Sequence, residues 1–121
     1  MIRKAGTGAV LAIAIACVAV SPAFAGDYAP LDCARAKAPA EKTVCWNYAL
    51  GQAEARMATL YGIATALVAM GQRGDIGDAQ RQWRQRRDAC GRDVACLTKA
   101  YKDRISQLSQ VIAAIASRGP Y

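Results

Sequence analysis

The sequence predicts an all-α fold: a small, disulfide-stapled antiparallel helical bundle of about three helices, which follows a cleaved signal peptide. Three observations support this prediction. Apolar residues recur every three or four positions over residues 94–116, which is the period of an amphipathic helix. Four cysteines follow residue 26 of a short chain, which is typical of disulfide-linked exported domains. No stretch alternates between apolar and polar residues as a strand does.

The first 25 residues have the pattern of a secretory signal peptide. Arg3 and Lys4 precede the uncharged residues 5–20, and Ala23-Phe24-Ala25 supplies an A-x-A cleavage site. The uncharged run is shorter than the roughly 20 residues that span a membrane. Lipidation at Cys17 is a less favoured alternative, because the apolar run continues beyond it. We therefore expect a mature domain of residues 26–121 that has no transmembrane segment and a net charge of 14 − 9 = +5.

The composition argues against catalysis and against metal binding. The chain has no histidine, so it lacks a histidine-activated nucleophile and an imidazole metal ligand. No G-x-G-x-x-G or P-loop sequence occurs, which disfavours nucleotide chemistry. The aspartates mostly fall at expected helix starts and turns, and residues 75–78 are too short for a calcium loop. We expect a protein that is not an enzyme and that holds no cofactor and no metal.

The four remaining cysteines are expected to form two disulfides. These cysteines are Cys33, Cys45, Cys90 and Cys96, and they allow three disulfide connectivities. A zinc site is the alternative. Gaps of eleven and five residues do not match the usual zinc spacing. Short loops favour Cys33–Cys45 and Cys90–Cys96. An unbroken helix would separate the second pair by about 9 Å, beyond the ~7 Å that a disulfide tolerates. Gly91-Arg92-Asp93 supplies the required helix break.

Residues 26–40 contain two prolines and predict an irregular arm. Pro39 suits the first turn of a short helix that ends near Cys45, with Glu41 close to its positive end. Asn47 suits the N-cap of a long helix that runs to about Met70.

Residues 57–72 of this long helix carry no charge. One interpretation is a well-buried core helix with an alanine-rich exposed side. The other is a ridge of small residues that lets a second helix approach closely: Ala58, Gly62 and Ala66. Residues 57–70 are therefore a candidate surface for self-association.

Three glycines predict a loop over residues 71–78, after which Asp78 would cap a helix over residues 79–90. Gly91 suits the position after that helix, and Asp93 the N-cap of a last helix over residues 94–116. The apolar residues that recur along the last helix form a continuous seam, which should be buried. The positions expected to be most buried are Leu97, Tyr101, Ile105 and Leu108.

Two cysteine-containing segments resemble one protein family. The family is that of the lysozyme inhibitor LprI-like N-terminal domain, and the segments are LDCARAKAPAEKTVC (31–45) and QRQWRQRRDACGRDVACLTKAYKDRISQL (80–108). The resemblance covers about residues 31–108. It implies a small exported bacterial protein and inhibition of a lysozyme, without assigning inhibitory residues. Trp46-Asn47-Tyr48 departs from the polar, proline-containing helix start that is usual in the family.

Several residues are candidates for a structural role. Trp83 is expected to anchor the core, and Arg87 lies one helical turn after it, where its guanidinium can stack on the indole. The family-like W-x-x-x-R-D string suggests that Arg87 is structural, and its pairing with Glu54 is a hypothesis. Tyr101 belongs to the same signature.

Other residues are candidates for contact with a partner. The helix over residues 79–90 is the most basic stretch, which indicates either a surface for an anionic partner or an ordinary solvated face. An arginine placed between the carboxylates of a hydrolase would act at short range, and the arginines considered are Arg73, Arg81 and Arg84. The segment with Trp46 and Tyr48 is the alternative contact, because it either packs over a disulfide or stands exposed.

Taken together, these features predict an exported, non-catalytic binding protein of the periplasm or the extracellular space. Its candidate function is inhibition of a lysozyme-like cell-wall hydrolase. The alternative is an envelope structural protein, or one that binds an anionic envelope component, without inhibitory activity. Export argues against nucleic acid as a partner.

Overall fold

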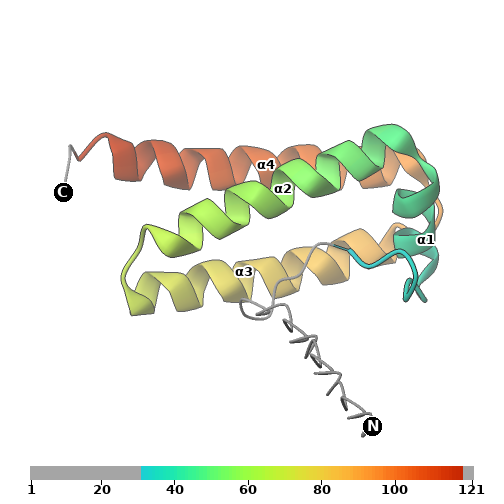
Figure 1. Ribbon diagram of the computed structural model, residues 1–121, viewed down its shortest axis with the longest axis horizontal. Helices are drawn as coiled ribbons and strands as arrows, with labels where there is room; N and C mark the ends of the chain where they lie inside the picture. The colour runs from blue at the N-terminus through green and yellow to red at the C-terminus, as the bar shows by residue number, and fades with distance from the viewer. Residues whose placement is uncertain (1–30, 119–121) are drawn as a thin grey trace, which may run out of the picture.

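The computed structural model describes residues 31–118, which form four helices joined by short connections (Figure 1). Their bounds are Pro39–Trp46 (α1), Tyr48–Ala66 (α2), Met70–Ala89 (α3) and Val94–Ala116 (α4). No strand occurs within these residues, so the all-α prediction is confirmed, although the bundle has four helices rather than about three. The expected signal peptide, Cys17 and residues 26–30 and 119–121 of the expected domain lie outside the described residues.

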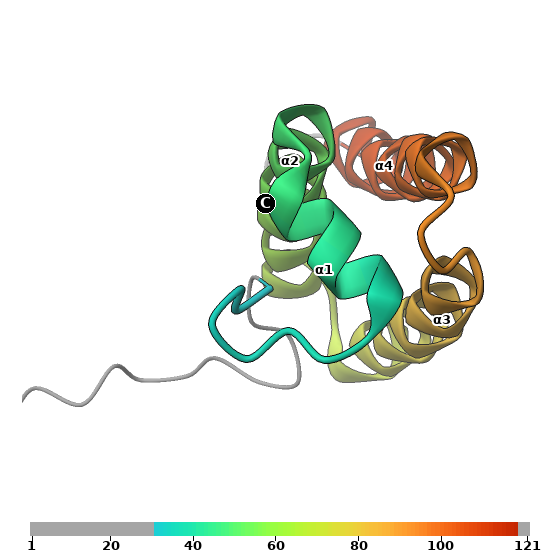
Figure 2. The same cartoon turned by 90° about the vertical axis from the view of Figure 1, so that its right-hand side faces the viewer.

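The three long helices lie side by side, and α3 runs opposite to α2 and α4 (Figure 1). The helix α2 packs most extensively on α4. The short helix α1 crosses one end of the bundle and contacts both α2 and α3 (Figure 2). The core therefore lies between α2, α3 and α4 and is closed at one end by α1. Its largest fully buried side chains are Tyr101, Leu50, Met57, Leu97, Leu108 and Val44.

Helix starts follow the expected local chemistry. The Asn47 side chain accepts a hydrogen bond from the Leu50 amide at 3.1 Å, and Asp93 accepts one from the Cys96 amide at 3.0 Å. Before α1, the Glu41 carboxylate accepts hydrogen bonds from the amides of Lys37 and Ala38. These contacts confirm the predicted N-caps Asn47 and Asp93 and satisfy amides that a helix start leaves without partners.

Two disulfides join the pairs that the short loops favoured. The Cα atoms of Cys33 and Cys45 lie 5.7 Å apart, and those of Cys90 and Cys96 lie 5.6 Å apart. The first bond ties the N-terminal arm to α1. The second closes the turn between α3 and α4, where Gly91 has a φ of 57° that a residue with a Cβ would adopt only with strain.

The predicted loop over residues 71–78 is wrong, and Asp78 is not an N-cap. Helix α2 ends at Ala66 rather than near Met70, and α3 already begins at Met70. Three glycines cost about 1 kcal/mol each relative to alanine in a helix, but tertiary contacts oppose this cost. The side chain of Ile76 is buried in the core. The Arg73 guanidinium donates hydrogen bonds to the Thr65 and Val68 carbonyls at the end of α2, which fixes the α2–α3 turn.

The seam of α4 also differs from the prediction by one position. Leu97, Tyr101 and Leu108 are buried as expected, but Ile105 is only half-buried and Arg104 takes the inward position. The inward positions follow spacings of four, three and four residues, which place residue 104 rather than 105 on the buried face. A search for apolar residues passes over an arginine at such a position.

Candidate functional site

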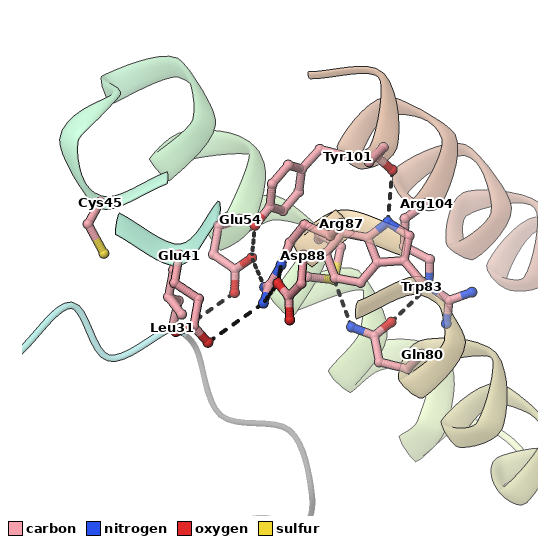
Figure 3. Close-up of polar contacts among 12 residues, drawn as sticks. Leu31, Glu41, Cys45, Glu54, Gln80, Trp83, Arg87, Asp88, Tyr101 and Arg104 are labelled. Carbon is pink, nitrogen blue, oxygen red and sulfur yellow. Dashed lines mark hydrogen bonds and ion pairs between the residues drawn. The ribbon is translucent and has the colours of Figure 1, made fainter. Parts of the chain in front are cut away.

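A buried cluster of charged residues lies where the four helices meet, and Arg87 is its centre (Figure 3). The Arg87 side chain is only 5% exposed. Its Nη2 lies 2.7 Å from an Asp88 oxygen and 3.8 Å from Glu41, and its Nη1 lies 3.9 Å from Glu54. Glu54 is the partner expected for Arg87, and Glu41 and Asp88 contact the same guanidinium.

Glu54 connects this cluster to α4 and to the N-terminal arm. The Tyr101 hydroxyl donates a 2.6 Å hydrogen bond to Glu54 Oε2, and the Leu31 amide donates one of 3.3 Å to Oε1. Burial raises the pKa of the Tyr101 hydroxyl, and the Glu54 carboxylate raises it further. The phenol therefore stays protonated and serves as a hydrogen-bond donor.

Trp83 packs against the same cluster. Its indole Nε1–H donates a 2.9 Å hydrogen bond to the Ala100 carbonyl on α4. The rings of Trp83 and Tyr101 meet edge to face with centroids 5.2 Å apart, and the Arg87 guanidinium lies 5.5 Å from the indole centroid. Since Trp83, Arg87 and Tyr101 bond chiefly to one another and to neighbouring helices, we infer that they hold the helices together.

A second buried polar group, which the apolar pattern does not predict, consists of Gln80 and Arg104. The Arg104 side chain donates hydrogen bonds to Gln80 Oε1 at 2.8 Å, to Gln107 Oε1 at 3.2 Å and to the Ile76 carbonyl at 3.3 Å. The Gln80 amide in turn lies 3.2 Å from the Met57 sulfur. The only available signal was that Gln80 and Arg104 fall on the apolar faces of their helices.

The three candidate contact arginines are not brought together as one surface. The Arg73 guanidinium is used to cap the end of α2. Arg81 forms an ion pair with Asp78 on its own helix, and Arg84 is half-buried. Arg73 and Arg81 therefore already make contacts within the protein.

Trp46 and Tyr48, by contrast, are the two most exposed large apolar side chains described. Trp46 ends α1 and is 89% exposed, and Tyr48 begins α2 and is 84% exposed. Only Asn47, the N-cap of α2, separates them. The Cys33–Cys45 disulfide adjoins Trp46, so both aromatic residues stand on a corner that is covalently and locally constrained. The Trp46 side chain is therefore exposed and does not pack over the disulfide.

The uncharged part of α2 is partly open as well. Ile63 and Leu67 are exposed, Met70 at the start of α3 is 83% exposed, and a Cβ added at Gly62 would meet nothing within 4 Å. Ala64 and Met57 are buried on the opposite side. The expected surface for self-association thus remains accessible along one side of α2.

Within residues 31–118, no group of three or more metal-ligating side chains gathers in one place. In the same residues, none of the helices combines the length and the apolar character needed to cross a membrane.

The fold and these sites define a small, all-helical protein that is closed by two disulfides and carries an exposed aromatic corner. Residues 33–118 match the family described as lysozyme inhibitor LprI, and the chain belongs to this family. No curated protein and no solved structure matches the chain. The disulfides and the family together indicate an exported protein.

Proposed function

We propose that this protein is a non-catalytic inhibitor of a lysozyme-like cell-wall hydrolase, exported to the periplasm or the extracellular space. The observation that carries the proposal is the family match over residues 33–118, which spans all four helices. An expected signal peptide over residues 1–25 and a chain without histidine agree with an exported binding protein.

We further propose that Trp46 and Tyr48 form the centre of the contact with the hydrolase. Tryptophan and tyrosine are enriched among the residues that dominate binding energy, because each buries a large area and loses little conformational entropy. Both side chains are almost fully exposed and stand on a constrained corner, so little further ordering is needed on binding.

Charge supports a contact that is made at short range. The expected mature chain carries +5, and lysozymes of animals are generally basic, so long-range attraction between the two proteins is absent. Aromatic contacts do not depend on such attraction. Inhibition is therefore expected to be modest and to survive raised salt.

The proposal is tested by lysis of cell walls by a lysozyme in the presence of excess purified protein, at low and high salt. The variant Trp46→Ala/Tyr48→Ala should lose most of the inhibition in both conditions. The matched double variant Arg81→Ala/Arg84→Ala, and Arg73→Ala with its fold verified, should retain it. Inhibition retained by the aromatic variant would show that the contact with the hydrolase lies elsewhere on the protein.

The second candidate function is binding to an anionic envelope component without inhibition. It is favoured by exposed cations on α3 and in the α3–α4 turn that form no ion pair within residues 31–118, including Arg86 and Arg92. Such binding should fall steeply as salt rises. Absence of inhibition at both salt concentrations, with salt-sensitive binding to anionic polymers, would favour this function.

A further inference from the structure

A groove of about 370 Å³ lies between α3 and α4, outside the aromatic corner. Its volume is at the small end of the roughly 300–1,000 Å³ that is usual for ligand pockets. The apolar part of its lining is formed by Trp83, Ala100 and the Cys90–Cys96 disulfide. Because the indole and the disulfide are each fixed by bonds to neighbouring elements, this part of the groove is already formed without a ligand.

The charged part of the lining consists of two cations, Arg86 and Lys99, and the carboxylate of Asp103. Arg86 projects from α3 and Lys99 from α4. Lys99 is already paired, because its Nζ lies 2.6 Å from an Asp103 oxygen. Within residues 31–118 no carboxylate lies at ion-pair distance from Arg86. The charge of Arg86 is therefore available to a ligand.

A buried cation that does not itself line the groove is hydrogen-bonded to one of the lining residues, Gln107. Arg104 is 4% exposed, and the three acceptors of its hydrogen bonds are neutral: Gln80, Gln107 and the Ile76 carbonyl. Gln107 also lines the groove. Burial is the main cause that lowers the pKa of Arg104; Tyr61 opposes this shift, and the charge of Arg86 adds to it. Neutral acceptors supply hydrogen bonds but no counter-charge, so a negative charge in the groove would stabilise Arg86 and Arg104 together.

We propose that the α3–α4 groove binds an amphiphilic carboxylate, a small molecule with a flat apolar body and one negative charge. The apolar body lies against Ala100 and the Cys90–Cys96 disulfide and reaches the small exposed part of Trp83, which is only 2% exposed. The carboxylate accepts paired hydrogen bonds from the Arg86 guanidinium. This site is independent of the proposed lysozyme inhibition, since Trp46 and Tyr48 lie at the α1–α2 corner.

The two tryptophans of the chain make the site testable by nuclear magnetic resonance on the intact, isotope-labelled protein. The probe is 2-naphthoate. We expect its titration to shift the indole N–H signal of Trp83 saturably, with a dissociation constant of about 1 mM or lower. The indole signal of Trp46, which is outside the groove, should not move. Absence of a saturable shift at Trp83, or larger shifts at Trp46, would overturn the proposal.

Two further probes test separately the roles of the charge and of the apolar body of the proposed ligand. The neutral analogue 2-naphthamide has the same shape and should bind about tenfold more weakly, because it lacks the charge-assisted hydrogen bonds. Inorganic phosphate should produce no comparable shift of Trp83. Equal binding of the acid and the amide would refute the role of the charge, and phosphate binding as tight as naphthoate binding would refute the role of the apolar lining.

The variant Arg86→Gln tests the residue assignment. It should weaken 2-naphthoate binding about tenfold, whereas Arg56→Gln, which removes the same charge from an exposed position on α2, should change binding less than about twofold. Arg86 is exposed, so both variants should keep the thermal unfolding transition of the parent. Equal effects of the two variants would show that only net charge matters and would overturn the assigned site.

Discussion

The Tyr101 hydroxyl on α4 donates a 2.6 Å hydrogen bond to Glu54 on α2, although the two residues are 47 positions apart in the sequence. Glu54 also lies 3.9 Å from Arg87 on α3, and Arg87 lies 3.8 Å from Glu41 on α1. One connected set of polar contacts thus reaches all four helices (Figure 3). Because Glu54, Arg87 and Tyr101 are buried, loss of one of them leaves its buried partner with fewer contacts, which costs more than the net gain of the bond itself.

Replacement of Tyr101 by phenylalanine is therefore expected to destabilise the protein. The change removes the hydroxyl and the 2.6 Å hydrogen bond that it donates to the Glu54 carboxylate, at a cost of about 1–3 kcal/mol. The measurement is the free energy of unfolding in urea. Tyr48→Phe is the matched control, since Tyr48 is exposed, and it should change this free energy by less than about 0.5 kcal/mol. Equal effects of the two variants would contradict the described role of Tyr101.

Ionisation of the tyrosines should report the same contact. The folded state raises the pKa of Tyr101 above its ordinary value of 10.0, through burial and the adjacent Glu54 carboxylate. Stability from this group is fully present below pH 10 and is lost as the pH rises further, because only the unfolded chain then ionises it. Of the five tyrosines, Tyr101 should ionise only as the helices unfold. Absorbance at 295 nm and circular dichroism, recorded on one titration, test this coupling; in Tyr101→Phe the late absorbance step should be missing.

Stability should also fall in acid through Glu41. The Lys37 amide, followed by the Ala38 amide and the Arg87 charge, lowers the pKa of this carboxyl below 4.5, although partial burial opposes the shift. The stabilisation is therefore present above pH 4.5 and is lost as the pH falls through the lower folded-state pKa. Glu41→Gln should make the unfolding free energy less dependent on pH below 4.5. Asp75→Asn, at an exposed position, is the control; an unchanged pH dependence in Glu41→Gln would rule out this contribution.

The inward face of α4 predicts that substitutions of Leu108 and Ile105 lower the free energy of unfolding by different amounts. Leu108→Ala should cost about 2–5 kcal/mol, because Leu108 is fully buried and its removal leaves a cavity. Ile105→Ala should cost only about 1 kcal/mol, because Ile105 is half-buried. Urea unfolding of both variants distinguishes this arrangement from the seam that the apolar pattern alone predicts, in which the two costs would be equal.

Local patterns in the sequence predicted most of the fold. Asn47 and Asp93 marked two helix starts correctly, because N-capping depends on a side chain and an amide a few positions away. The start of α3 was missed, because it depends on tertiary contacts: Arg73 binds carbonyls at the end of α2 and Ile76 enters the core. Helix propensity alone cannot reveal such contacts.

The candidate site was predicted less completely than the fold. The signature string indicated a structural role for Arg87 but does not itself point to Glu54, which lies 3.9 Å from the guanidinium. Arg104 was missed, because an apolar periodicity search treats a charged residue as outward-facing. Exposure decided between the two interpretations of Trp46, and no pattern in the sequence carries that information.

The central claim is that this protein binds a lysozyme-like hydrolase through its aromatic corner. Isothermal titration calorimetry of a lysozyme with the parent protein and with Trp46→Ala/Tyr48→Ala tests it most directly. We predict saturable binding of defined stoichiometry by the parent, and affinity at least about tenfold weaker for the variant, whose circular dichroism should be unchanged. Equal affinity of the two proteins, or no binding by the parent at any salt concentration, would contradict the claim.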